Sequence, residues 1–193
     1  SAILCLVCLN KVYTRQEDYF KIANIKEVLI AADLNQKIIR EAVYKFKYNF
    51  IQDLGFPLAE LLIDHLNLKT KQHYLFDFDF VIPVPLSKKK LLQRGFNQSE
   101  ILAKHVGDYF NWPLETELLY RKHRRKSQID LSYQKRHENV KDVFSLKSPF
   151  SLKGKKILLI DDIVTTGATL SACAKALKLA GATEIWSLVL AKK

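Results

Sequence analysis

The clearest chemical pattern in the sequence is a pair of adjacent carboxylates, Asp161 and Asp162, that follows the apolar run 157–160. After two further positions comes a segment rich in hydroxyl groups, residues 165–169, which reads Thr-Thr-Gly-Ala-Thr. Such a segment at the start of a helix binds phosphate, because the helix dipole is positive there and threonine hydroxyls add donors. Gly167 lets the backbone adopt a positive φ or approach a ligand closely. Since carboxylates accept hydrogen bonds from the paired hydroxyls of a ribose, the spacing predicts a site for a sugar phosphate.

A basic segment after the apolar run 80–85 is the second candidate anion site. Its cations are Lys88, Lys89, Lys90 and Arg94. We expect them to lie in a loop, from which residues 95–98 lead into a helix. A guanidinium group and the start of a helix both favour phosphate oxygens. A lysine-rich loop taken alone is equally well explained as solvated surface. This segment therefore indicates an anion site only in combination with the acidic pair.

The elements that must position these residues alternate between strands and helices. Strands are expected at 28–32, 80–85, 114–119, 157–160 and 185–190. Helices are expected to begin near Asn35, Pro57, Asn97 and Thr169, with a short one after Ser132. This alternation predicts an α/β fold with a mainly parallel sheet that is covered by helices on both faces. Ligands of such sheets bind at the carboxyl ends of strands, so we expect the site after Val84 and Ile160.

The segment 157–169 resembles the signature of type I phosphoribosyltransferases at every position: an apolar strand, two acidic residues, two variable positions and Thr-Thr-Gly-x-Thr. The resemblance implies a type I phosphoribosyltransferase fold and a site for phosphoribosyl pyrophosphate (PRPP). In that family the acidic pair holds the ribose hydroxyls and the threonine-rich loop holds the 5′-phosphate. The PRPP-binding residues implied here are Asp161, Asp162, Thr165, Thr166, Gly167, Ala168 and Thr169.

Two other segments are similar to one branch of these proteins, the ComF (ComFC/GntX) family, which is linked to natural competence. Ile-Pro-Val-Pro-Leu at 82–86 and Arg-Gly-Phe-Asn-Gln at 94–98 resemble its pyrophosphate-loop region. The pattern Gln-x-x-Leu-Ser…Arg…Asn-Val…Phe within 128–144 resembles a later segment, which in related transferases includes a flexible loop that closes over PRPP. The residues assigned to these two loops are Lys88, Lys89, Lys90, Arg94, Gly95, Asn97, Gln98, Gln128 and Arg136.

The reaction that the resemblance implies breaks the anomeric C–O bond while positive charge develops on the ribose. Mg²⁺ neutralises the departing pyrophosphate and is the expected cofactor. Positioning and charge stabilisation dominate such a reaction, so the expected catalytic residues are Asp161, Asp162 and Arg94. Proton exchange with an incoming nucleophile is a second role open to Asp162, although ribose binding is its simpler one.

Cys5 and Cys8 have the spacing of half a tetrahedral zinc site. Members of the resembled family often carry a four-cysteine zinc module at this end, and the second pair is missing here. Loss of an upstream pair, decay of the module, a metal shared between two chains, or simply two reduced thiols all remain open. Cys173 has helical spacing to apolar neighbours and is expected in the core. We divide the chain into an N-terminal appendage, 1–25, and a phosphoribosyltransferase-like domain, 26–193.

Composition narrows the number of domains, the cellular compartment and the class of partner that we expect. A chain of 193 residues with 48% hydrophobic content suits one α/β domain. Its three cysteines are an odd count, which favours a reducing compartment over a disulfide framework. No apolar run reaches the length of a membrane span, so a cytoplasmic protein is expected. The net charge of +11 suits nucleic acid, yet PRPP is itself strongly anionic, so charge does not discriminate between them.

Three functions remain open from the sequence. The first is a magnesium-dependent phosphoribosyltransferase whose acceptor the sequence does not name. The second is a competence-type protein that handles single-stranded DNA during DNA uptake and retains the PRPP site. Basic loops and nearby aromatic residues would suit base stacking in that case, although the same aromatics suit core positions equally well; they are Tyr109, Phe110, Trp112, Tyr120 and Tyr133. The third is a PRPP sensor without turnover. A homodimer is compatible with each.

Overall fold

The computed structural model describes residues 21–48, 51–72, 74–122, 143–147 and 151–193. The expectations for Cys5, Cys8, Gln128, Arg136 and Tyr133, and for a helix after Ser132, lie outside the described residues. Within the described part, no helix combines the length and apolar character that crossing a bilayer requires.

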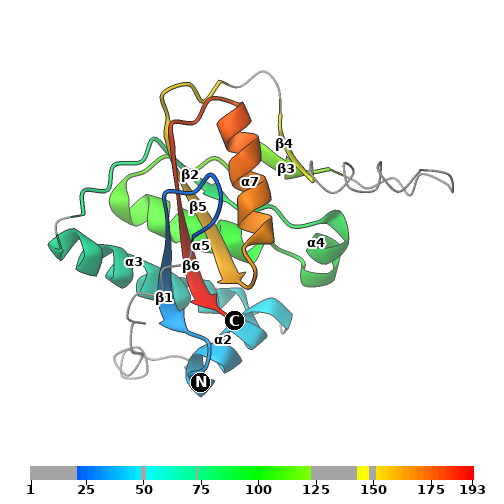
Figure 1. The fold of residues 1–193 in the computed structure, drawn as a ribbon. Helices are drawn as coiled ribbons and strands as arrows, with labels where there is room; N and C mark the ends of the chain where they lie inside the picture. The colour runs from blue at the N-terminus through cyan, green and yellow to red at the C-terminus, as the bar shows by residue number, and fades with distance from the viewer. Residues whose placement is uncertain (1–20, 49–50, 73, 123–142, 148–150) are drawn as a thin grey trace, which may run out of the picture.

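Four parallel strands form the central sheet in the order β1-β6-β5-β2. Their bounds are Glu27–Asp33 for β1, Phe80–Pro83 for β2, Lys156–Val164 for β5 and Glu184–Lys192 for β6. The strands are rich in apolar residues on both faces, which is typical of a parallel sheet covered on both sides. Figure 1 shows this sheet running through the middle of the molecule. The predicted mainly parallel sheet is confirmed.

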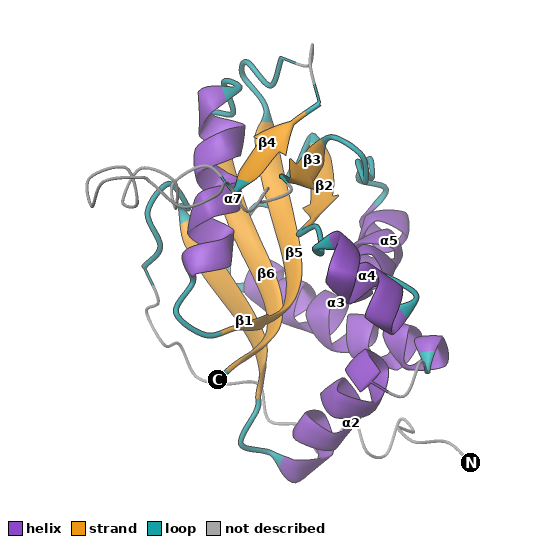
Figure 2. Cartoon of the chain, turned by 90° about the vertical axis from the view of Figure 1, so that its right-hand side faces the viewer, coloured by secondary structure: helices purple, strands orange, loops and turns teal. Residues whose placement is uncertain are grey.

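Helices cover both faces of the sheet (Figure 2). On one face lie α2 (Lys37–Tyr48), the 3-10 turn η1 (Gln52–Leu54), α3 (Gly55–Lys71) and α5 (Gln98–Phe110). On the other lie α7 (Ala168–Leu179) and a small antiparallel pair of strands, β3 (Leu119–Arg121) and β4 (Phe144–Leu146). The short helix α4 (Lys88–Arg94) follows β2.

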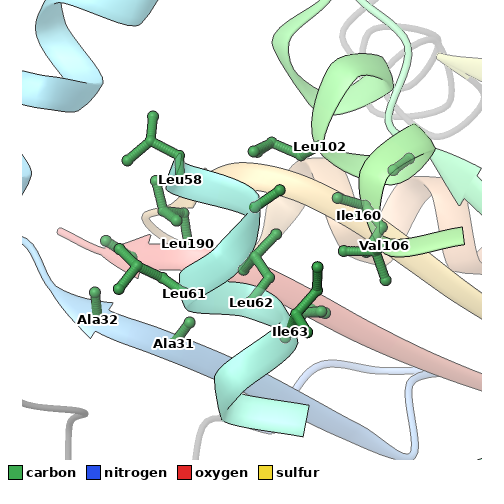
Figure 3. Close-up of a cluster of buried hydrophobic side chains, with 14 of the residues drawn as sticks. Ala31, Ala32, Leu58, Leu61, Leu62, Ile63, Leu102, Val106, Ile160 and Leu190 are labelled. Carbon is green, nitrogen blue, oxygen red and sulfur yellow. The ribbon is translucent and has the colours of Figure 1, made fainter. Parts of the chain in front are cut away.

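The core between the sheet and its first helical layer fixes α3 and α5 firmly against β5 and β6. Leu58, Leu62 and Leu102 are fully buried there and are among the side chains drawn in Figure 3. Each such side chain contributes about 1.5–3 kcal/mol when it is removed from water. The first turn of α5, which carries polar residues of the candidate site, is therefore held by a rigid scaffold.

Three expectations about individual elements need correction. Residues 88–94 were expected in a loop, but they form α4, because Ser87 caps the helix by accepting the N–H of Lys90 and Gly95 ends it with a φ of 71°. The expected strand at 114–119 reduces to an isolated bridge between Leu114 and Val81, followed by β3. The strand expected at 157–160 continues to Val164, because its last residues still pair with β6.

Candidate ligand-binding site

The acidic pair lies within β5, near its carboxyl end, and not in a loop after it. Asp161 is in register with Val189 of β6, and Ile163 is in register with Ala191. Successive strand residues point to opposite faces, so the two carboxylates leave the strand in different directions. Asp162 is buried and Asp161 is partly buried. Both side chains are therefore held in place by the sheet.

Asp161 is bound by the first turn of α5. The Ser99 hydroxyl donates to Asp161 Oδ1 at 2.9 Å, and the same oxygen accepts the N–H of Asp162 at 2.9 Å. Burial and the neighbouring Asp162 charge raise the pKa of Asp161 to about 7, although these two hydrogen bonds and the charge of Lys47 act in the opposite direction. The sequence did not predict this raised pKa.

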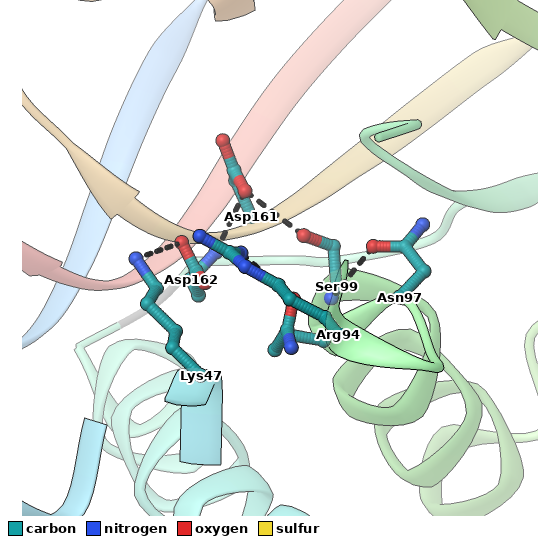
Figure 4. A network of polar contacts seen from close by, with 7 residues as sticks. Lys47, Arg94, Asn97, Ser99, Asp161 and Asp162 are labelled. Carbon is teal, nitrogen blue, oxygen red and sulfur yellow. Dashed lines mark hydrogen bonds and ion pairs between the residues drawn. The ribbon is translucent and has the colours of Figure 1, made fainter. Parts of the chain in front are cut away.

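Asp162 has a partner that the sequence analysis missed. Lys47 Nζ from α2 lies 2.9 Å from Asp162 Oδ1, and the two side chains are only 15% and 9% exposed. Figure 4 shows Lys47 reaching the acidic pair from the opposite side to Ser99. The sequence held one weak signal that Lys47 is not an ordinary surface lysine. Lys47 follows Phe46, which lies on the apolar face of an amphipathic helix.

The threonine-rich segment forms the turn between β5 and α7. Gly167 has a φ of 77° at the N-cap position of α7, as its expected role required. The helix begins at Ala168, one residue earlier than expected, and Thr166 Oγ1 accepts the N–H of Ala168 at 3.4 Å. Thr165, Thr166, Ala168 and Thr169 are exposed. The start of a twelve-residue helix, with its positive dipole end, is thus open to solvent beside the acidic strand.

The basic segment divides into two parts. Lys88, Lys89 and Lys90 are exposed on α4, whereas Arg94 is partly buried. Arg94 Nη1 donates to Gln98 Oε1 at 2.9 Å, and its guanidinium lies 5.3 Å from the ring centre of Tyr48 on α2. In Figure 4 its side chain extends from α4 toward the acidic pair. Arg94 joins the site, whereas the three lysines lie exposed on α4.

Asn97 and Gln98 support this arrangement from the start of α5. Asn97 caps the helix by accepting the N–H of Ser99 at 3.2 Å, and its amide donates to the Val84 carbonyl at 3.2 Å, which ties α5 to the end of β2. Gln98 is 1% exposed, and its Nε2 has no hydrogen-bond partner among the described residues. The side chain of Gln98 therefore serves to orient Arg94 from below the surface.

Within the described ranges, no group of three or more His, Cys, Asp and Glu side chains gathers to hold an ion. Two adjacent carboxylates fit Mg²⁺ delivered with a phosphorylated ligand, because this ion commonly uses one or two carboxylates together with substrate phosphates and waters. Cys173 is fully buried behind β5, and burial raises the pKa of its thiol, so its expected core role is confirmed.

Comparison with known proteins gives both a family match and named relatives. The family model described as Phosphoribosyl transferase domain matches residues 92–193. The chain is 28% identical over 148 residues to DNA utilization protein YhgH of Salmonella typhimurium, with 76% of this chain and 64% of the relative covered. It is 32% identical over 148 residues to Competence protein F of Haemophilus influenzae, with 75% and 64% covered.

A third relative is Competence protein ComFC of Streptococcus pneumoniae, which is 33% identical over 144 residues, with 72% of this chain and 57% of the relative covered. The chain thus spans 64% or less of the length of these relatives. Their similarity extends over more of the chain than the family model does, which matches from residue 92 onward.

Proposed function

Because the chain belongs to the phosphoribosyl transferase domain family, whose model matches residues 92–193, we propose that it binds PRPP with Mg²⁺ and transfers or senses phosphoribosyl groups. The type I phosphoribosyltransferase fold and the resemblance to the ComF family, both predicted from the sequence, are confirmed by this match and by the competence-protein relatives. The ligand, the cofactor and the acceptor belong to the proposal.

One juxtaposition carries the proposal. The solvent-open turn at the start of α7 begins directly after β5, the strand that carries Asp161 and Asp162, and Arg94 extends toward this acidic pair. A phosphate on the turn, a pair of hydroxyls on the carboxylates and a second anion near Arg94 follow one another in the order in which PRPP carries these groups. The 5′-phosphate would bind the amides of residues 166–169, and the pyrophosphate would bind near Arg94 and the start of α5.

The chemistry expected of this site depends more on position and charge than on covalent catalysis. As the anomeric C–O bond breaks, its electron pair leaves with the pyrophosphate, and the carboxylates of β5 face the positive charge that develops on the ribose. Mg²⁺, when bound, would neutralise charge on the leaving pyrophosphate. The incoming nucleophile must lose a proton. Asp161, with a pKa of about 7, is better placed to accept that proton than Asp162, because Asp162 is ion-paired with Lys47.

Calorimetric titration with PRPP and Mg²⁺ tests the proposal. The wild-type chain should bind, and the double variant Asp161→Asn with Asp162→Asn should lose binding, because Asn lacks the negative charge with which each carboxylate would accept the ribose hydroxyls. Asp108→Asn is the matched control, since Asp108 is an exposed acid on α5 that pairs with Lys104. Equal affinity in the wild type and the double variant would contradict the assignment. Pyrophosphate release with an acceptor, or its absence, then separates a transferase from a sensor.

A second function, the handling of single-stranded DNA, is favoured by the names of the relatives, which refer to competence and to DNA utilization. The exposed lysines of α4 would supply the cationic surface. Tyr109 and Tyr120 are 55% and 39% exposed and remain candidates for stacking on bases. Phe110 and Trp112 instead stack on each other at 4.5 Å and pack against the core, so we withdraw them from that role.

Titration of single-stranded DNA at several salt concentrations, with and without PRPP and Mg²⁺, distinguishes the two functions. Competition between PRPP and DNA would indicate a shared cationic surface, and a steep salt dependence would indicate phosphate contacts. A chain that binds PRPP but shows no affinity for DNA would remove the second function.

A further inference from the structure

Lys47 is a cation within the site that lies outside both the sequence motif and the region matched by the family model. Its ion pair with Asp162, at 2.9 Å with side chains 15% and 9% exposed, is largely shielded from water. Such a pair is screened less than a surface pair, and removing one partner leaves the other charge buried without compensation. A ligand hydroxyl that takes the Asp162 oxygen facing Lys47 must therefore leave the Lys47 ammonium with another anion to pair with.

The position of Lys47 is fixed relative to the basic segment. Its neighbour Phe46 is fully buried, and the Phe46 ring centre lies 5.6 Å from that of Phe96, the residue directly before Asn97. On the other side of Lys47, the Tyr48 ring lies under the Arg94 guanidinium. The end of α2 is thus anchored to residues 94–98, the segment that we assign to the pyrophosphate. Lys47 and Arg94 reach the site together as parts of one contact.

We propose that Lys47 is a specificity-determining residue that selects ribose carrying an anomeric pyrophosphate. In the unliganded chain it pairs with Asp162. When ribose hydroxyls donate to Asp162, the Lys47 ammonium turns to the pyrophosphate, so that both buried charges keep a partner. This inference rests on the proposed function, because it takes PRPP as the ligand.

Ribose 5-phosphate provides the contrast that the mechanism needs. It carries hydroxyls for Asp162 and a phosphate for the turn at α7, but it lacks an anion for the displaced lysine. Binding it through the Asp162 oxygen that faces Lys47 would therefore leave the ammonium without a partner. Preference for PRPP over ribose 5-phosphate should consequently depend on Lys47.

The test is calorimetric titration of PRPP with Mg²⁺, and of ribose 5-phosphate, into three proteins: wild type, Lys47→Met and Lys45→Met. Lys45 is a matched control, because two residues along a helix turn the side chain by about 200°, away from the site. Lys47→Met should reduce the affinity ratio of PRPP to ribose 5-phosphate by about 10- to 100-fold, the range of one charge-assisted contact. Lys45→Met should leave the ratio within about threefold of wild type.

The titrations separate failure of the Lys47 inference from failure of the proposed function. An unchanged ratio in Lys47→Met, or tighter PRPP binding, would overturn the inference and make Lys47 a counter-ion that only competes with the ligand. A wild-type chain that binds no PRPP would overturn the proposed function itself. Should Lys47→Met fail to fold, wild-type protein with ¹³Cε-labelled lysine gives a second measurement. The Lys47 signal, assigned with Lys47→Arg, should move with PRPP and not with ribose 5-phosphate; any other pattern contradicts the exchange.

Discussion

Replacing Asp161 by Asn should stabilise the unliganded chain, and the gain should grow with pH. Burial beside Asp162 raises the pKa of Asp161 from its ordinary value of 3.8 to about 7. Between these two values the folded chain holds a proton that the unfolded chain has released. The free energy of unfolding therefore falls as pH rises through that window and levels off above it. Asn keeps the oxygen that accepts the Ser99 hydroxyl but never has to lose a proton.

The magnitude follows from the gap between the two pKa values. At about 1.4 kcal/mol per pH unit, a gap of about 3 corresponds to about 4 kcal/mol once the carboxylate is fully ionised. Part of this cost is already present at pH 5, so the difference in unfolding free energy between Asp161→Asn and wild type should widen by about 2–3 kcal/mol between pH 5 and pH 8.

Urea unfolding at pH 5, 6, 7 and 8 measures this difference, and groups distant from Asp161 cancel from it. Asp108→Asn is the control, since that side chain is 64% exposed and its difference from wild type should stay flat over the same range. A constant or shrinking advantage of Asp161→Asn with rising pH would refute the reasoning. In that case the site would hold Asp161 ionised throughout.

Two further predictions concern the start of α5 and the turn after α7. Asn97→Ala removes the cap of α5 and the hydrogen bond to the Val84 carbonyl, so it should cost about 1–2 kcal/mol and lower the melting temperature by several degrees, whereas Asn97→Asp should recover the capping part. An unchanged melting temperature for Asn97→Ala would count against the cap. Gly181→Ala should destabilise more than Gly154→Ala, because both have a positive φ but only at Gly181 would the new Cβ lie 3.1 Å from backbone atoms of Lys153. Urea unfolding compares the two variants, and an equal loss of unfolding free energy in both would contradict the expected clash with Lys153.

The parts of the candidate site whose local geometry the sequence predicted are contiguous in the chain. Residues 161–169 carry their chemistry within one strand-turn-helix unit, so the acidic pair, the positive φ of Gly167 and the start of α7 could be read locally. Burial of Cys173 was predictable for the same reason, because helical spacing alone places it on the apolar face.

The parts that the sequence missed depend on tertiary contacts. Lys47 meets Asp162 only because α2 packs against Phe96, and no local pattern marks a lysine as the partner of a distant acid. Ser99 was likewise absent from the expected site, although it directly follows Asn97 and Gln98, which were both assigned to it. The pKa of Asp161 arises from burial on the assembled sheet. The helix at 88–94 was missed because the lysines suggested a loop, while the cap at Ser87 and the turn at Gly95 were overlooked.

Amide resonances of residues 165–169 in a ¹⁵N-labelled sample test the PRPP site most directly. Addition of PRPP with Mg²⁺ should move the signals of Thr166, Gly167, Ala168 and Thr169, because their N–H groups would take the 5′-phosphate at the start of α7. The same addition to the Asp161→Asn, Asp162→Asn protein should leave them in place. If these four signals stay unchanged in the wild-type chain while PRPP binds elsewhere or not at all, this turn is not the phosphate site and the chain uses its fold for something else.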